Sequence, residues 1–237
     1  MTEQVPASQF GNGSEQAGPQ RRPAQRQPAL PAWPALPWPA LIAVATDSPS
    51  AERAVVAGAD IVDLTLLGPD GARDFLTRHP EVRFCAGLRP GVTAPADAGG
   101  TPLAGRHPAL SRQPDEAGPD TLLVCDSVPA ARAAGLPPAR LVVMGTPADL
   151  AAVTGAGLAA WVDADLAPPA RPGPGAREDR YTDPALTAGS AATAALATWL
   201  GAALISTSHP VEVRRAIDMT AAIAGWRRPA RTVRGLA

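Results

Sequence analysis

The sequence predicts an α/β fold built around a parallel sheet. Seven short apolar segments alternate with segments of helical pattern, and nearly every predicted strand is followed by a predicted helix. The connections between the first strands and helices are tight, as in strand–helix–strand units. Two architectures fit these observations, a (β/α) barrel and an open doubly wound sheet. No Gly-x-Gly-x-x-Gly motif follows the first strand, which disfavours a dinucleotide-binding sheet.

The elements are predicted in order from residue 41. Short apolar runs between turn-forming residues predict strands at 41–45, 59–64, 82–86, 121–125, 140–144, 159–162 and 203–206. Helices are predicted at 50–57, 72–78, 130–134, 148–153, 185–200 and 211–224. Ser50 is a suitable N-cap for the first helix, and Gly58 ends it. Residues 88–119 and 167–180 are polar and rich in Gly and Pro, so both predict long loops, the first with the alternative of a lost element.

Three regions are expected along the chain. Residues 1–38 are rich in Gln, Pro, Gly and Ser and show no hydrophobic period, which predicts a disordered tail. Residues 39–226 form the folded domain. Residues 227–237 form a basic tail, for which a solvated charged end is a simpler interpretation than a phosphate-binding segment.

The composition excludes several kinds of chemistry. The chain has no Lys, all 21 basic residues are Arg, and the only Asn is Asn12. An amine nucleophile, a Schiff base and a P-loop lysine are therefore excluded. Two Cys residues exclude a disulfide framework, and the His residues have no ligand spacing, so no metal site is proposed.

Charge and hydropathy set the expected partners and compartment. The net charge of −1 gives no case for nucleic acid or membrane partners. The apolar run at 28–45 ends in Ala-Val-Ala and resembles a secretion signal, but its prolines prevent a helix there. We therefore expect a cytoplasmic protein. These prolines are Pro28, Pro31, Pro34, Pro37 and Pro39.

Four stretches of the folded domain match one known family, in the family's order. They are Val44-Ala45-Thr46-Asp47-Ser48-Pro49-Ser50, Gly58-Ala59-Asp60-Ile61-Val62-Asp63, Trp199-Leu200-Gly201-Ala202 and Ile205-Ser206-Thr207-Ser208-His209-Pro210-Val211. With them the chain resembles the dihydropteroate synthases and the wider pterin-binding barrel family. The resemblance implies a TIM-type (β/α)8 barrel, which we expect to be irregular or one strand short in this chain.

Several residues that the family uses are absent. Its first-strand Asn is replaced by Val44 or Ala45, and its last-strand Arg by Thr207. Its Gly-rich loop after the second strand reads Thr65-Leu66-Leu67-Gly68-Pro69, and its Asp-Pro-Gly in the sixth strand reads Met144-Gly145. Its Ser-Arg-Lys cannot exist without Lys. The resemblance therefore implies a diverged, active-site-depleted member.

Asp126 and Ser127 are the predicted pterin-binding residues. The resemblance matches Asp126 to an Asp of the third or fourth strand. Either match places it at the carboxyl end of a strand, where barrel active sites lie. There its carboxylate would accept N–H bonds from a pterin-like ring. The alternative is an N-cap for the helix that follows.

Asp47, Ser48 and His209 form a second predicted group. Asp47 and Ser48 end the first strand, where they either cap a helix or hold an anion. The resemblance implies that His209 helps to hold an anion, with a packed or capping His as the alternative. Asp163 and Asp165 alternate on a predicted strand and are either an acid–base pair or a solvated strand end. No catalytic residue is assigned.

Two functions follow from the resemblance. The first is a non-catalytic paralogue that binds a pterin-like small molecule, as a homodimer or as the partner of a true synthase. The alternative is a divergent active synthase, a transferase that joins 6-hydroxymethyl-dihydropterin pyrophosphate to p-aminobenzoate in folate biosynthesis. It would need Mg²⁺ and an Arg in place of the missing Lys, with Arg89 and Arg180 as the candidates.

Overall fold

Eight parallel strands form a closed barrel in the computed structural model of the chain. The structure describes residues 39–86, 109–112, 121–165 and 183–226. The strands follow one another around the barrel in chain order, and β1 (Ala40–Val44) pairs with β8 (Leu204–Thr207) to close it. The predicted TIM-type (β/α)8 barrel is therefore confirmed.

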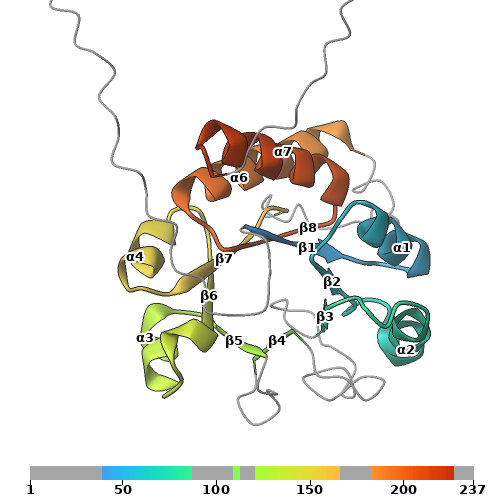
Figure 1. Cartoon of the computed structure of the whole chain (residues 1–237), viewed down its shortest axis with the longest axis horizontal. Helices are drawn as coiled ribbons and strands as arrows, with labels where there is room; N and C mark the ends of the chain where they lie inside the picture. The colour runs from blue at the N-terminus through green and yellow to red at the C-terminus, as the bar shows by residue number, and fades with distance from the viewer. Residues whose placement is uncertain (1–38, 87–108, 113–120, 166–182, 227–237) are drawn as a thin grey trace, which may run out of the picture.

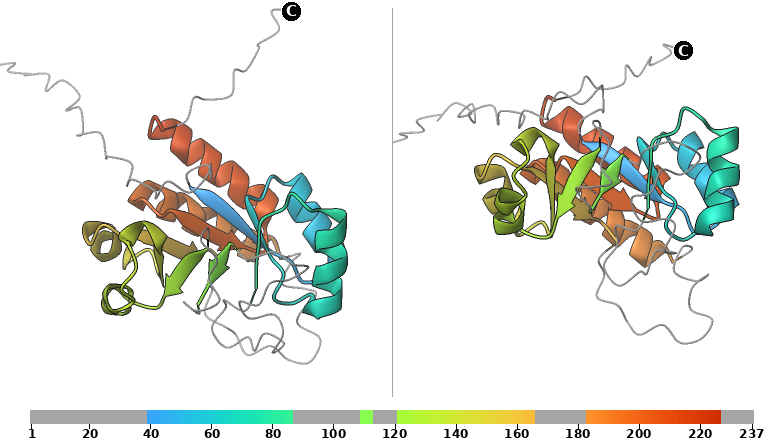
Figure 2. Two further views of the ribbon diagram at one scale, coloured as in Figure 1. Left: turned by 60° about the horizontal axis from the view of Figure 1, so that its bottom comes forward. Right: turned by 90° about the horizontal axis from the view of Figure 1, so that it is seen from below.

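Helices surround the strands on three sides (Figure 1). The remaining strands are β2 (Ile61–Asp63), β3 (Phe84–Cys85), β4 (Leu110–Ser111), β5 (Leu122–Cys125), β6 (Leu141–Gly145) and β7 (Ala159–Asp163). The helices are α1 (Ser48–Val56), α2 (Gly68–Arg78), α3 (Val128–Ala133), α4 (Leu150–Gly155), α6 (Pro184–Leu200) and α7 (Pro210–Ile223), with a 3₁₀ turn η2 (Pro138–Arg140) before β6. The further views in Figure 2 show α2 and α7 on the outer side of the strands.

The barrel has all its strands, contrary to the expectation of an irregular or shortened barrel. The strand that was not predicted is β4. It lies within residues 88–119, which were predicted to form a long loop or to have lost an element. Leu110 pairs with Cys85 of β3 on one side and with Leu122 of β5 on the other. Two residues are too short a run to show a period in the sequence. This strand is defined by the pairing partners on its two sides.

Two helix starts also differ from the prediction. Asp47, not Ser50, is the N-cap of α1, and the two residues form a reciprocal capping box. Helix α2 begins at Gly68 rather than residue 72, with Pro69 and Asp70 in its first turn. Both residue types are favoured there, since Pro needs no N–H partner and the carboxylate faces the positive end of the helix.

Alternation along the strands divides the core in two. Side chains such as Ile42, Val124 and Trp161 pack inside the barrel. Their neighbours in sequence point outward and pack against the helices, as Leu41 and Val162 do. The Trp161 indole N–H donates a 2.9 Å hydrogen bond to the Ser206 hydroxyl, so the largest buried side chain of the barrel has its polar atom satisfied.

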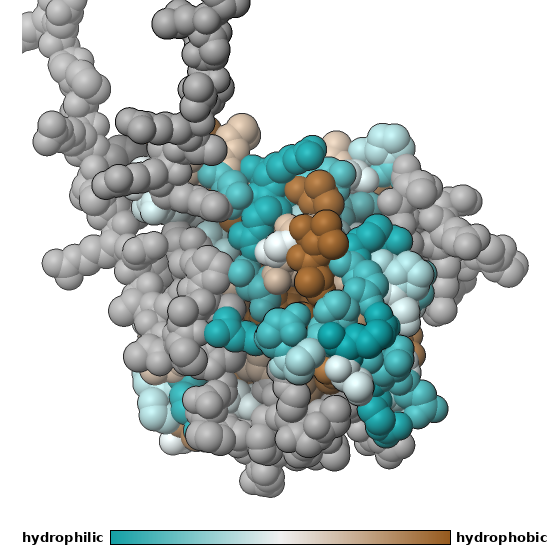
Figure 3. Space-filling model, turned by 45° about the vertical axis from the view of Figure 1, so that its right-hand side comes forward, coloured by the Kyte–Doolittle hydropathy of each residue, from teal (hydrophilic) through white to brown (hydrophobic). Residues whose placement is uncertain are grey.

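Large apolar residues are exposed mainly on the last two helices. They are Leu196, Trp199 and Leu200 of α6 and Val211, Met219 and Ile223 of α7. Helix α6 has no charged residue along its 17 positions. On the side of the molecule shown in Figure 3, a narrow hydrophobic strip lies between hydrophilic residues. No helix in the described ranges is both long and apolar enough to span a membrane.

The two predicted tails lie outside the described residues. Residues 1–38 and 227–237 therefore stay as predictions, as does the division of the chain into three regions.

Candidate functional site at the carboxyl ends of the strands

Two carboxylates point into the barrel at the carboxyl ends of their strands. Asp63 ends β2 and Asp163 ends β7. Two residues earlier in each strand, Ile61 and Trp161 belong to the interior cluster. Because side chains alternate along a strand, Asp63 and Asp163 lie on the inner face as well. Asp63 was not predicted as a site residue, although it stands within one of the stretches that resemble the family.

The Asp63 carboxylate is held in one position. It is 1% exposed, and its Oδ1 accepts a 3.0 Å hydrogen bond from the Thr65 backbone N–H and a second bond from the Thr65 hydroxyl. Asp163 is held in the same way, since its Oδ1 accepts a 3.1 Å bond from the backbone N–H of Asp165. Both carboxylates are thus oriented by the loop that follows their own strand.

Asp126 lies at the same end of the barrel and forms an ion pair with Arg112. It follows β5, not the third or fourth strand to which the resemblance matched it. Arg112 follows β4, and its Nη1 lies 2.5 Å from Asp126 Oδ1. Two residues before each of them, Leu110 and Val124 belong to the interior cluster, so both side chains begin on the inner face.

The capping alternative for Asp126 is wrong. The N-cap of α3 is Ser127, whose Oγ accepts a 3.2 Å hydrogen bond from the Ala130 backbone N–H. The Asp126 side chain is 72% exposed, whereas that of Arg112 is 27% exposed. The carboxylate is therefore accessible to a ligand, and its guanidinium partner is the more shielded of the two.

A fourth acidic residue, Asp165, accepts hydrogen bonds from α6, from β8 and from the residue that follows β8. Its Oδ1 accepts from the hydroxyls of Ser190 in α6 (2.9 Å) and Thr207 in β8 (2.8 Å). Its Oδ2 accepts a 2.5 Å bond from the Ser208 backbone N–H. Asp163 is the last residue of β7, and both Asp163 and Asp165 are partly buried and accept hydrogen bonds from the protein, so neither carboxylate is fully solvated.

His209 is buried beside this cluster. It occupies the N-cap position of α7 without a capping side-chain bond, so the capping alternative does not hold. Its Nδ1 lies 3.2 Å from the Thr187 hydroxyl, which also donates to the Asp183 carbonyl. The His209 ring is thus linked to the start of α6 through Thr187.

Asp47 serves as a cap. Its Oδ1 accepts a 2.7 Å hydrogen bond from the Ser50 backbone N–H, and this bond is the main cause that holds the pKa of Asp47 below its usual value. Ser48 is the first residue of α1 and lies half-buried beside the cap. Since the Asp47 carboxylate already accepts from the helix end, its local role is structural.

Two further groups near the strand ends are occupied or buried. The Thr146 backbone N–H and hydroxyl both donate to Asp149 Oδ2 at 2.8 Å, which lowers the pKa of Asp149. Burial raises the pKa of the Cys125 thiol, and the nearby Asp126 carboxylate adds to this effect. A thiol with a raised pKa holds little thiolate at neutral pH, so Cys125 is a poor nucleophile.

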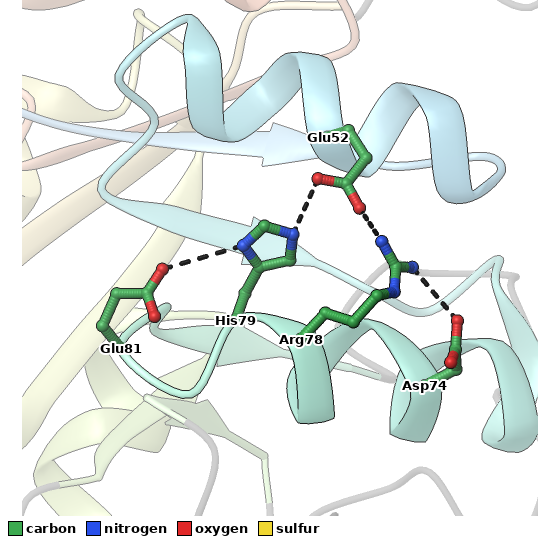
Figure 4. Close-up of polar contacts among 5 residues, drawn as sticks. All are labelled: Glu52, Asp74, Arg78, His79 and Glu81. Carbon is green, nitrogen blue, oxygen red and sulfur yellow. Dashed lines mark hydrogen bonds and ion pairs between the residues drawn. The ribbon is translucent and has the colours of Figure 1, made fainter.

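A mixed cluster of acidic and basic residues lies away from the strand ends. Glu52 of α1 pairs with Arg78 and with His79 Nε2 (2.7 Å), and Asp74 and Glu81 extend the group (Figure 4). In the described part of the chain, no three His, Cys, Asp or Glu residues are placed to hold a metal ion. This cluster joins α1 to α2 on the outside of the barrel.

Acidic groups gather at the carboxyl end of the barrel. Asp63, Asp126 and Asp163 are hydrogen-bond acceptors there, and Arg112 is a cation already paired with one of them. Such a set suits a ligand that presents N–H donors. Arg89 and Arg180, the expected cation suppliers, lie outside the described residues, and Arg112 was missed because β4 was missed.

The solved structures that resemble the chain include dihydropteroate synthases. Mycobacterium tuberculosis Rv1207 has a TM-score of 0.55 at 18% identity, over 81% of this chain and 94% of that one. A Coxiella burnetii dihydropteroate synthase in complex with pteroic acid gives 0.55 at 15% identity, over 80% and 94%. A Xanthomonas albilineans dihydropteroate synthase in complex with 7,8-dihydropteroate gives 0.51 at 18%, over 80% and 94%.

The likeness to these proteins is one of fold. No family model matches the sequence, and no curated protein matches it. The chain is therefore a (β/α)8 barrel of the dihydropteroate-synthase type in its architecture. This agrees with the family resemblance seen in the sequence.

Proposed function

We propose that the protein binds a pterin-like heterocycle at the carboxyl ends of its strands and has little or no synthase activity. The observation that carries the proposal is the accessible Asp126 carboxylate at the same end of the barrel as the inward-facing Asp63 and Asp163. A pterin ring presents amino and ring N–H donors on one edge, and carboxylates are the strongest acceptors for them. The barrel end is also where ligands of this fold class bind.

The charge of the site supports the lack of synthase activity. Release of pyrophosphate requires positive charge where the leaving group develops its negative charge. The chain has no Lys, and Arg112 is neutralised by Asp126. The carboxylates of Asp63, Asp126, Asp163 and Asp165 outnumber the Arg112 guanidinium at the described strand ends, and this excess of negative charge opposes binding of a pyrophosphate.

Binding is tested by titration calorimetry with 6-hydroxymethylpterin. We expect Asp126→Ala to weaken binding about 10- to 100-fold, since a hydrogen bond to a charged group contributes roughly 1.5–3 kcal/mol. Asp74→Ala removes the same charge from the outer surface of α2 and is expected to bind as the wild type does. Absence of binding by the wild type at millimolar ligand would refute the proposal.

The alternative is an active synthase in which Arg112 supplies the positive charge. Its position after β4, at the end of the barrel where chemistry occurs in this fold, favours this role. Turnover of pterin pyrophosphate and p-aminobenzoate, with and without Mg²⁺, tests the alternative. Wild-type turnover that Arg112→Ala abolishes would replace our proposal with this one.

We also propose that two copies associate through α6 and α7. The observation behind this proposal is the group of exposed Leu196, Trp199, Met219 and Ile223 in the second halves of these neighbouring helices, beside an uncharged α6 surface. Sedimentation velocity tests it. We expect a dimer that Leu196→Glu converts to a monomer, and a monomeric wild type at micromolar concentration would refute it.

A further inference from the structure

Met144 is an apolar side chain on a strand between two acidic strand ends. It is the fourth residue of β6, it is half-buried, and it packs against the cluster inside the barrel. Its register partner in β7 is Trp161, which belongs to the same cluster. Strand β6 lies between β5, which Asp126 follows, and β7, which Asp163 ends. Met144 therefore points into the barrel from between the strands that carry these two carboxylates.

The strand register places Met144 beside Asp126. Cys125 of β5 pairs with Val143 of β6. Because the two strands are parallel, the next residue along each of them, Asp126 and Met144, are also neighbours across the strands. On its other side, Asp126 forms the ion pair with Arg112. A ligand that binds the Asp126 carboxylate thus has a guanidinium on one flank and a thioether on the other.

The apolar character of this flank is not offset by the loop that follows β6. The Thr146 backbone N–H and hydroxyl both donate to Asp149, so these polar groups are engaged within the loop. Another apolar residue at a strand end, Val44 of β1, is only 4% exposed. Met144 keeps more of its surface open than Val44 does. It is therefore the better placed of the two to contact a ligand.

We infer that Met144 is a specificity-determining residue which lies against the aromatic ring of a ligand whose N–H edge binds Asp126. This inference rests on the proposed function. A thioether is polarisable and flexible, and it makes favourable contacts with aromatic rings. A sugar or an aliphatic amine could use the carboxylate but would gain nothing from the thioether beside it. The ligand class is therefore narrowed to planar heteroaromatic rings.

The contact is tested by NMR of the full chain labelled with ¹³C at the methionine methyl groups, with 6-hydroxymethylpterin as the probe. Single Leu substitutions assign the Met144 and Met219 signals. We expect the Met144 methyl to show a ring-current shift on saturation with the pterin. Met219 lies on the outer surface of α7, is 62% exposed, and serves as the internal control whose signal stays in place. A Met144 signal that does not move while the pterin binds would overturn the inference.

The effect on specificity is tested by titration calorimetry of two substitutions. Met144→Gln keeps the length of the side chain and replaces its apolar end with an amide. It is expected to bind 6-hydroxymethylpterin about 3- to 10-fold more weakly, the size of a lost sulfur–aromatic contact. Met144→Leu keeps the apolar volume and is expected to bind within about twofold of the wild type. Equal affinities of the wild type and a folded Met144→Gln would overturn the inference.

The outcomes separate this inference from the proposed function. Circular dichroism and thermal melting first establish that the variants fold, and if Met144→Gln does not fold, the NMR titration of the wild type decides. A wild type that binds no pterin at millimolar ligand refutes the proposed function and the inference with it. A wild type whose binding is weakened by Asp126→Ala, with an unmoved Met144 signal, leaves the proposed function standing and overturns the role of Met144.

Discussion

Asp60 connects the first two strands of the barrel to its last helix. Its Oδ2 accepts a 2.7 Å hydrogen bond from the Leu41 backbone N–H in β1 and lies 2.5 Å from Arg214 Nη2 in α7. The Asp60 and Arg214 side chains are only 13% and 16% exposed. Arg214 also donates to the Gly58 carbonyl at 3.0 Å. We predict that Asp60→Ala is strongly destabilising.

The size of the effect follows from these contacts. The Asp60→Ala substitution removes the acceptor of the Leu41 N–H. Because Leu41 is fully buried, water cannot replace this acceptor, and the loss costs about 1–3 kcal/mol. Breaking a fully buried ion pair costs about 3–5 kcal/mol and an exposed one about 0–1 kcal/mol. The Asp60–Arg214 pair lies between these limits, and Arg214 keeps the Gly58 carbonyl, so we assign this part about 1–2 kcal/mol. The total is about 2–5 kcal/mol, or roughly 5–15 °C in melting temperature.

The assay is urea unfolding of the full chain, followed by circular dichroism. Asp60→Asn keeps an oxygen for the Leu41 N–H and removes only the charge, so its loss is expected to be about 1–2 kcal/mol. A double-mutant cycle with Arg214→Ala measures the coupling of the pair and is expected to give a value of the same size. The reasoning is refuted if Asp60→Ala unfolds within about 0.5 kcal/mol of the wild type.

Three further predictions concern single side chains. Bonds from Ser50 lower the pKa of Asp47 below its usual 3.8. The wild type is therefore expected to be about 1 kcal/mol more stable than Asp47→Ala above pH 3.8, and this difference declines as pH falls through the lowered folded-state pKa. Urea unfolding of both proteins at pH 7 and at pH 2.5 measures the difference. Among the described residues the buried Thr198 hydroxyl has no hydrogen-bond partner, so Thr198→Val is expected to raise stability by about 1 kcal/mol in thermal melts; a loss would contradict this. Ser206→Ala leaves the buried Trp161 N–H without its acceptor, and a cost of about 1–3 kcal/mol is expected by urea unfolding; an unchanged midpoint would refute it.

Most strands were predictable because their signal is local. The run at 41–45 is apolar along its whole length and the run at 121–125 is apolar after Thr121, as expected of strands buried on both faces. Strand β4 was not predictable, since two residues within a polar, Pro-rich stretch carry no period. The position of β4 is set by its pairing with β3 and β5 in the closed barrel. A local stretch of sequence does not show such pairing.

The candidate site was predicted in part. Asp126 and His209 were selected because the resemblance matches them to family residues at strand ends, and Asp47 because it closes the first predicted strand; the structure places all three at strand or helix ends. Their partners were not visible in the sequence. The ion pair between Asp126 and Arg112 joins the ends of β5 and β4, and the sequence did not reveal β4. A search for charged residues beside every possible two-residue strand would have found Arg112 only among many others.

The amino-acid sequence alone determined the class of fold and the limits of the chemistry. Alternating apolar and helical segments require a parallel sheet covered by helices, and the absence of Lys excludes every lysine-based mechanism. Only the tertiary structure decided which polar groups meet. Asp165 and Ser208 are 43 positions apart, and their contact exists because β7 and β8 are neighbours in the barrel. The alternation of side chains along a strand is local and can be predicted from the sequence. The neighbours of a strand are set by closure of the whole barrel, so contacts between strands appear only in the tertiary structure.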